Sequence, residues 1–173
     1  MAGKIQYSLG EEDLGRAASN LLYRGTPKND TFHGKSGDDT ISGANGNDKL
    51  YGDKGNDGVY GQNGNDKLFG EAGYDLLDGG TGNDKLKGGS EADSFIFSTK
   101  YDKDTILDFR LGDIITHDTV RLAGLNSVDD ITDLREFHMT QVGKNVVIDG
   151  GGGDVLVLKG IDLDDLQDYH FTF

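Results

Sequence analysis

A nine-residue repeat runs without a gap from Gly25 to Ile96 in this 173-residue chain. The first position is Gly and the sixth is Asp in all eight copies, and the eighth is always apolar. The sixth positions are Asp30, Asp39, Asp48, Asp57, Asp66, Asp75, Asp84 and Asp93. The eighth positions are Phe32, Ile41, Leu50, Val59, Leu68, Leu77, Leu86 and Phe95. A fixed short period predicts a stack of similar units, each resting on its neighbours.

The repeat pattern G-G-x-G-x-D-x-U-x resembles the RTX family (repeats in toxin, the hemolysin-type calcium-binding repeat). The resemblance implies an all-β chain whose centre is a right-handed parallel β-roll bound to calcium. It also implies the C-terminal module of a type I-secreted protein of a Gram-negative bacterium. RTX proteases, RTX lipases and the R-modules of alginate epimerases carry such modules. We therefore divide the chain into an N-terminal flank, residues 1–24, the roll, residues 25–96, and a C-terminal cap, residues 97–173.

Each column of the repeat has its own physical reason. Positions one to six are expected to form a turn, in which Gly at positions one and four permits positive φ and turns carbonyls inward. Positions seven to nine are expected to form a short strand with the apolar eighth residue pointing inward. Two nonapeptides then complete one coil, and each repeat stacks on the next but one at about 4.8 Å.

This stacking places the Asp column along two edges. Carboxylates about 5 Å apart repel by roughly 3 kcal/mol at an effective dielectric of about 20, and a cation between them reverses the effect. Calcium fits best, because it accepts six to eight oxygen ligands, including carbonyls, in loose geometry. We expect about six or more calcium ions, six of them between Asp30/Asp48, Asp48/Asp66, Asp66/Asp84, Asp39/Asp57, Asp57/Asp75 and Asp75/Asp93. The expected carbonyl ligands are those of Gly34, Gly37, Gly43, Gly46, Gly52, Gly55, Gly61, Gly64, Gly70, Gly73, Gly79 and Gly82.

One apolar side chain per nine residues makes a thin core, and 28 Gly residues raise the entropy cost of folding. We therefore expect the roll to stay largely unfolded until calcium binds. The net charge of −14 also favours cations as partners, and it argues against nucleic acid or anionic membranes. No stretch approaches the roughly 20 apolar residues of a transmembrane helix, and the chain has no Cys.

The N-terminal flank has the pattern of an amphipathic helix from Ser8 to Tyr23. Ser8 and Glu11 have capping-box spacing, and Leu14, Ala17, Ala18, Leu21 and Leu22 share one helical face. We expect this helix to cap the open end of the roll. A linker helix to an upstream domain is the alternative.

The C-terminal cap is expected to be rich in strands. The segments are strands at 94–98, 104–109, 113–115 and 120–124, a helix at 127–137, a hairpin of 146–148 with 155–158, and a helical turn at 161–166. The first strands resemble the segment that closes the roll in secreted RTX proteins. The acidic-then-aromatic end, residues 168–173, resembles an uncleaved type I secretion signal, and a final edge strand is the alternative.

Three functions compete for this chain. The first is a non-enzymatic, calcium-folded module that couples type I secretion to extracellular folding and stabilises an upstream domain. The second is a polysaccharide- or cell-surface-binding module, which the outward aromatics Tyr51, Tyr60 and Phe69 would serve unless they pack against other protein. The third, a catalytic fragment, is disfavoured because the chain has no H-E-x-x-H or G-x-S-x-G motif and its four His lack metal-ligand spacing.

Overall fold

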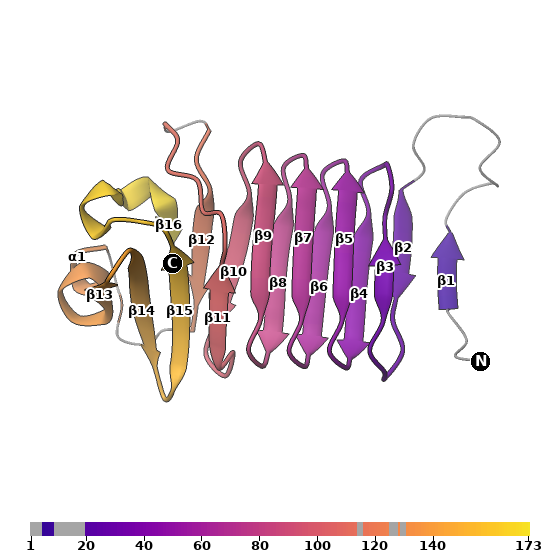
Figure 1. The fold of residues 1–173 in the computed structure, drawn as a ribbon, viewed down its shortest axis with the longest axis horizontal. Coiled ribbons are helices and arrows are strands. Elements are labelled where there is room, and N and C mark those ends of the chain that lie inside the picture. The colour runs from indigo at the N-terminus through magenta and orange to yellow at the C-terminus, as the bar shows by residue number, and fades with distance from the viewer. Residues whose placement is uncertain (1–4, 9–19, 114–115, 125–127, 129–130) are drawn as a thin grey trace.

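The computed structural model describes residues 5–8, 20–113, 116–124, 128 and 131–173. Two eight-stranded sheets extend along the long axis of the molecule (Figure 1). The first sheet has, in spatial order, β1 Ile5–Ser8, β2 Leu21–Arg24, β4 Thr40–Asn45, β6 Gly58–Asn63, β8 Leu76–Thr81, β10 Ser94–Ser98, β12 Thr119–Ala123 and β16 Phe171–Thr172. The second has β13 Met139–Val142, β14 Asn145–Gly151, β15 Asp154–Lys159, β11 Lys103–Ile106, β9 Lys85–Ser90, β7 Lys67–Ala72, β5 Lys49–Lys54 and β3 Thr31–His33.

Successive repeats alternate between the sheets, and the repeat strands within each sheet pair in parallel. Ile41 faces Val59 in the first sheet, and Leu50 faces Leu68 in the second. Each partner lies 18 residues further along the chain, which confirms the predicted coil of two nonapeptides. The fold is therefore the all-β parallel roll that the repeat predicts.

The strands are longer than the sequence suggested. A repeat strand such as Lys49–Lys54 has six residues and includes positions one to three of the next nonapeptide, so only positions four to six turn. The expected positive φ at position one is also wrong: Gly64 at position four has φ 132°, but the other positive value falls at position two, as in Gln62 with φ 79°. The chain bends at position two while the hydrogen bonds between the strands continue. Gly at position one is therefore required for another reason, which lies in the carboxylates along the two edges of the roll.

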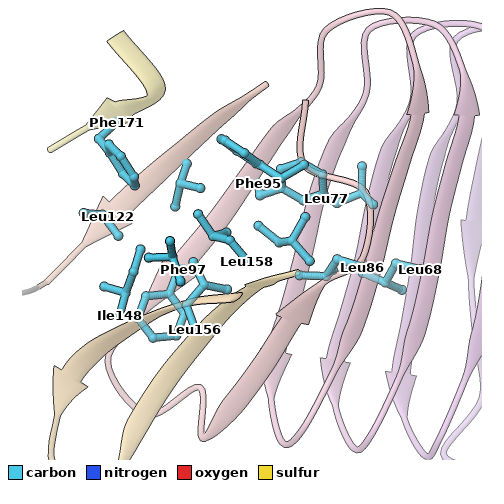
Figure 2. Packing of buried hydrophobic residues seen from close by; sticks show 14 of the residues in the cluster. Leu68, Leu77, Leu86, Phe95, Phe97, Leu122, Ile148, Leu156, Leu158 and Phe171 are labelled. Carbon is cyan, nitrogen blue, oxygen red and sulfur yellow. The ribbon is translucent and has the colours of Figure 1, made fainter. Parts of the chain in front are cut away.

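The eight apolar residues at position eight are all buried and form the inner column of the roll. This column continues without a break into the cap, where Phe97, Leu122, Ile148 and Leu158 extend the same cluster. Figure 2 shows Leu77 next to Phe95, and Leu158 between Leu86 and Phe97, all within one cluster. The roll and the cap therefore share one hydrophobic core.

The expected N-terminal helix is wrong where the structure describes it. Ser8 belongs to strand β1, and Leu21–Arg24 form β2, which pairs antiparallel with β1 and parallel with β4. Tyr23 takes the inward place opposite Ile41 and stacks on Phe32, with ring centroids 3.7 Å apart. Coverage of this end of the core by Tyr23 outweighs the helical pattern. The remainder of the expected helix, residues 9–19, lies outside the described residues.

The cap follows the prediction in most of its elements. The strand at 94–98 and the hairpin of β14 and β15 form as expected, whereas the strand predicted at 104–109 ends at Ile106. Helical structure occupies α1, Ile131–Asp133, and a π-helical turn, Leu134–His138. A 3-10 turn lies at Leu163–Asp165, inside the predicted helical turn. The chain ends in β16, which pairs with β12 at the edge of the first sheet. Most of the strand predicted at 113–115 lies outside the described residues.

Candidate metal sites along the two edges

The fold places the sixth-position Asp residues in two columns, one at each edge where the turns meet the strands. One column holds Asp30, Asp48, Asp66 and Asp84, and the other holds Asp39, Asp57, Asp75 and Asp93. All except Asp30 are no more than 2% exposed. Burial of seven carboxylates demands a partner for each oxygen.

The first oxygen of every carboxylate in the two columns except that of Asp30 holds two coils together. The backbone N–H of Asp48 donates to Asp66 Oδ1 over 2.7 Å, and that of Asp66 donates to Asp84 Oδ1 over 2.7 Å. The same bond recurs along the other edge, as from Asp57 to Asp75 Oδ1 at 2.8 Å. Each of these seven Asp residues thus accepts a charge-assisted hydrogen bond from the coil before it. The sequence did not reveal this structural role.

The second oxygen is left without a partner. Among the described residues, eight buried Oδ2 atoms accept no hydrogen bond: those of Asp39, Asp48, Asp57, Asp66, Asp75, Asp84, Asp93 and Asp104. A Cβ added at Gly34, Gly43, Gly52, Gly61 or Gly70 would lie closer than 3.0 Å both to such an Oδ2 and to the carbonyl oxygen of the position-one Gly in the next coil. Gly at position one is therefore needed because two oxygens converge there.

The electrostatics of the edges call for a cation. Burial, with a smaller contribution from neighbouring carboxylates, raises the pKa of Asp57 and Asp84 to about 7 and that of Asp93 to about 8. A metal ion would favour the ionised form instead. Carboxylate and carbonyl oxygens are the ligands that calcium prefers, and the orphaned Oδ2 atoms fit such an ion. Among the described residues, no three acidic, His or Cys side chains form a cluster that could hold a metal, so carbonyl ligands would be required.

Asp30 differs from the other repeat carboxylates. It is partly exposed, and its Oδ2 already accepts hydrogen bonds from the backbone N–H and the hydroxyl of Thr26, at 2.7 and 2.9 Å. The first pair, Asp30 with Asp48, therefore offers one unpartnered Oδ2 atom where the interior pairs offer two.

Two residues beyond the repeats join the columns and were missed by the sequence analysis. The N–H of Asp84 donates to Asp104 Oδ1 at 3.0 Å, and the N–H of Asp93 donates to Asp118 Oδ1 at 2.9 Å. The spacings of 20 and 25 residues break the period of nine. The sequence does contain one signal for them: Asp104 is followed two residues later by Ile106, and Asp118 by Val120, as position six of the repeat is followed by the apolar position eight.

A second ladder lies outside the Asp columns, at position five. The Oδ1 of Asn47 accepts the backbone N–H of Asn65, and that of Asn65 accepts the N–H of Asn83, at 2.8 and 2.7 Å. These exposed side chains link consecutive turns, which explains why Asn and Asp dominate this position.

The outward aromatics of the second sheet pack on one another. The rings of Tyr51 and Phe69 stack with centroids 4.7 Å apart, and His33 stacks on Tyr51 at 4.1 Å. Lys49 Nζ lies 5.0 Å from the Tyr51 centroid. The predicted proximity of Tyr51 and Phe69 is confirmed, and at least one face of each ring is covered by a neighbour.

Comparisons with known proteins agree with this geometry. The family model described as "RTX calcium-binding nonapeptide repeat (4 copies)" matches residues 24–59 and 60–95. The chain is similar in structure to the AlgE6R3 subunit of the Azotobacter vinelandii mannuronan C5-epimerase, with 24% identity, a TM-score of 0.50, and coverage of 96% of this chain and 84% of that chain. No curated protein matches the chain.

A second similar structure is larger. The extracellular lipase LipA from Serratia marcescens aligns over 93% of this chain with 18% identity and a TM-score of 0.47. The chain spans 42% of that lipase's length. No helix in the described part of the chain is long and apolar enough to cross a membrane.

Proposed function

Residues 24–95 form a β-roll of RTX calcium-binding nonapeptide repeats, and from this premise we propose that the chain is a calcium-folded module that couples type I secretion to folding outside the cell. The observation that carries the proposal is the set of eight buried, unpartnered Oδ2 atoms along the two edges. The repeat roll itself is a structural, non-catalytic module. An upstream domain of the same natural chain, which the roll would stabilise, completes the proposal.

We assign the metal ligands to the second oxygens of the edge carboxylates and to the Gly carbonyls that converge on them. The ligating side chains are those of Asp30, Asp39, Asp48, Asp57, Asp66, Asp75, Asp84 and Asp93, joined by the twelve Gly carbonyls named from the sequence. Six ions, each bearing two positive charges, would nearly cancel the chain's net charge of −14.

Folding should depend on calcium because the edges are unstable without it. Burial raises the pKa of Asp57 most, and the charges of Asp75 and Asp39 raise it further. Extracellular calcium modules bind with dissociation constants of about 10⁻⁴ to 10⁻³ M, well above cytosolic free calcium. The chain would then remain expanded inside the cell, pass through a narrow exporter, and fold outside, where calcium favours the folded state.

A calcium titration of the full chain tests this proposal. Circular dichroism and hydrodynamic radius should report an expanded chain in EGTA and a compact, β-rich chain in calcium. Magnesium should fail to replace calcium, because it needs a tighter octahedron and retains its water. A compact, β-rich chain in EGTA would disprove the folding switch even if calcium still bound.

The cap, residues 97–173, is proposed to nucleate the stacking of coils. It supplies large buried side chains, such as Phe97 and Phe171, to the core that it shares with the last coil. A chain that ends at Ile96 should therefore lose its calcium-induced folding. If that truncated chain responds to calcium as the full chain does, the cap has no nucleating role, although the roll assignment stands.

Export is tested separately from folding. The last residues, Asp168–Phe173, would act as the secretion signal although the end of this segment also forms an edge strand. Deletion of this segment should abolish export by a type I apparatus in a bacterial host. Unchanged export would refute the signal but leave calcium-dependent folding intact.

A second candidate function is polysaccharide binding, favoured by a shallow hollow of about 490 Å³ beside the first sheet. In the repeat that begins at Gly52, position seven is Gly58. A Cβ there would lie 3.0 Å from Tyr60 Cε2, so the Tyr60 ring lies close to the backbone of Gly58. Tyr74, at the position usually held by Asn, lines the hollow and is 62% exposed. Aromatic rings beside polar groups suit a sugar ring. A glycan pulldown in calcium should lose its signal in Tyr74→Ala, and a pulldown that recovers no glycan would reject this candidate.

A further inference from the structure

The edge column that contains Asp84 continues beyond the last nonapeptide. Asp104, 20 residues later, accepts the N–H of Asp84 at Oδ1 over 3.0 Å, as each repeat Asp accepts the N–H of the coil before it. Asp104 is 0% exposed. It thus occupies the place of a ninth repeat carboxylate, although the repeats matched by the family model end at residue 95.

The Asp84 and Asp104 side chains lie close together with free oxygens. Their Oδ2 atoms are both buried and have no partner among the described residues, and the two carboxyls are within hydrogen-bonding reach of each other. Asp78, whose Oδ1 is also buried and unpartnered, lies near enough to act on both electrostatically. Carboxylates this close and this dry must share a proton or bind a cation.

We propose that Asp84 and Asp104 together bind one further calcium ion, which joins the last coil of the roll to strand β11 of the cap. This proposal rests on the calcium-binding function proposed above. Asp104 Oδ2 and Asp84 Oδ2 are its side-chain ligands, and the ion holds both carboxylates in their charged form. The two edges of the roll then end differently.

The other edge closes without an equivalent pair of free oxygens. Asp118 Oδ1 accepts the N–H of Asp93 at 2.9 Å, and its Oδ2 accepts the N–H of Arg110 at 2.7 Å. Burial raises the pKa of Asp118, and the two backbone N–H groups and the Arg110 charge partly offset that rise. The Arg110 guanidinium itself donates to the carbonyl of Gly89 at 2.8 Å. Both oxygens of Asp118 therefore have hydrogen-bond donors from the protein, whereas Asp104 Oδ2 has none among the described residues. Asp118 is therefore a matched control.

The test compares Asp104→Asn with Asp118→Asn in the full chain. An Asn keeps an oxygen that can accept the N–H bond from the preceding coil, so either variant can form the ladder, and circular dichroism in calcium checks that it does. Isothermal titration and native mass spectrometry then count bound ions. Asp104→Asn should bind one ion fewer than the wild type, and Asp118→Asn should bind the same number as the wild type.

The outcomes separate the two proposals. If Asp104→Asn binds as many ions as the wild type, the pair shares a proton and the extra site does not exist, while the repeat sites stand. If none of the three proteins binds calcium, the proposed function itself fails. If Asp104→Asn does not fold, terbium is used in place of calcium with a folded variant. Tyr101 hydrogen-bonds to Asp78 beside the site, so its ring should sensitise the emission of a terbium ion bound there. Emission in Tyr101→Phe equal to that of the wild type would then overturn the inference.

Discussion

Replacing Asp66 by Asn should change stability in opposite directions with and without calcium. Asp66 is 1% exposed and sits between Asp48 and Asp84 in its column. Burial raises its pKa from 3.8 to about 6. One pKa unit corresponds to about 1.4 kcal/mol, so at neutral pH the calcium-free roll should carry a penalty of about 3 kcal/mol for this charge. Asn removes that charge and can keep an acceptor for the Asp48 N–H.

Asp66→Ala provides the contrast. Alanine also removes the charge, but it leaves the buried N–H of Asp48 without an acceptor, which costs about 1–3 kcal/mol. In EGTA, Asp66→Asn should therefore be more stable than the wild type and more stable than Asp66→Ala. In calcium, both variants lose a charged ligand shared by two sites, and the calcium midpoint should rise. Each 1.4 kcal/mol lost is about tenfold in the affinity of one site, and the midpoint of a transition that binds several ions together shifts by less than that.

The assay must make the calcium-free folded state measurable. An osmolyte such as trimethylamine oxide favours burial and can draw the EGTA form into a measurable transition. The three proteins are compared by the osmolyte concentration at half-maximal β signal, and again by calcium titration without osmolyte. If Asp66→Asn needs more osmolyte than the wild type, the buried charge does not destabilise the calcium-free roll. If its calcium midpoint equals that of the wild type, Asp66 is not a ligand.

Three other predictions concern Asp30, Asp93 and Gly64. Asp30→Ala should raise the calcium midpoint less than Asp66→Ala, because the second oxygen of Asp30 already accepts two hydrogen bonds; equal midpoints would contradict this. Burial raises the pKa of Asp93 from 3.8 to about 8, so the folded chain binds more protons than the unfolded chain in this range. The stability of the calcium-free roll should therefore fall as pH rises from 3.8 to about 8, and a rise over that range in EGTA would be contrary evidence. Gly64→Ala should weaken calcium-induced folding by at least the roughly 1–3 kcal/mol of a strained backbone, since φ is 132° and its Cβ would strike a neighbouring carbonyl. Gly143→Ala, with open space around it, should cost less, and the reverse order in thermal melts would refute the steric argument.

The repeat predicted the roll well because each repeat position is determined by the local geometry of a strand or a turn. The inward place of Leu68 and the register of 18 residues both follow from alternation along a strand and from the period. The two oxygens of each Asp could not be distinguished in the same way. The sequence shows that a carboxylate is present at each of these positions. Which of its oxygens accepts the hydrogen bond from the preceding coil depends on the distance and orientation of the coils, which the sequence does not give.

The misses lie where the period fails. Asp104 and Asp118 continue the columns after insertions, so only three-dimensional stacking identifies them. The N-terminal helix was predicted from a valid amphipathic pattern, but Tyr23 is better placed as a cover for Phe32 than on a helix face. Local propensity therefore lost to tertiary packing at the open end of the stack.

The hydrogen bond to each Oδ1 gives the roll a direction. In every case the donor belongs to the earlier coil and the acceptor to the later one, as from Asp48 to Asp66. A coil can satisfy its edge N–H groups only when the coil that follows it in sequence is already built. If the chain leaves the cell with Phe173 first, the later coils emerge before the earlier ones. Each arriving coil then meets a finished template that presents acceptors, so growth from the cap toward the N-terminus follows the order of export.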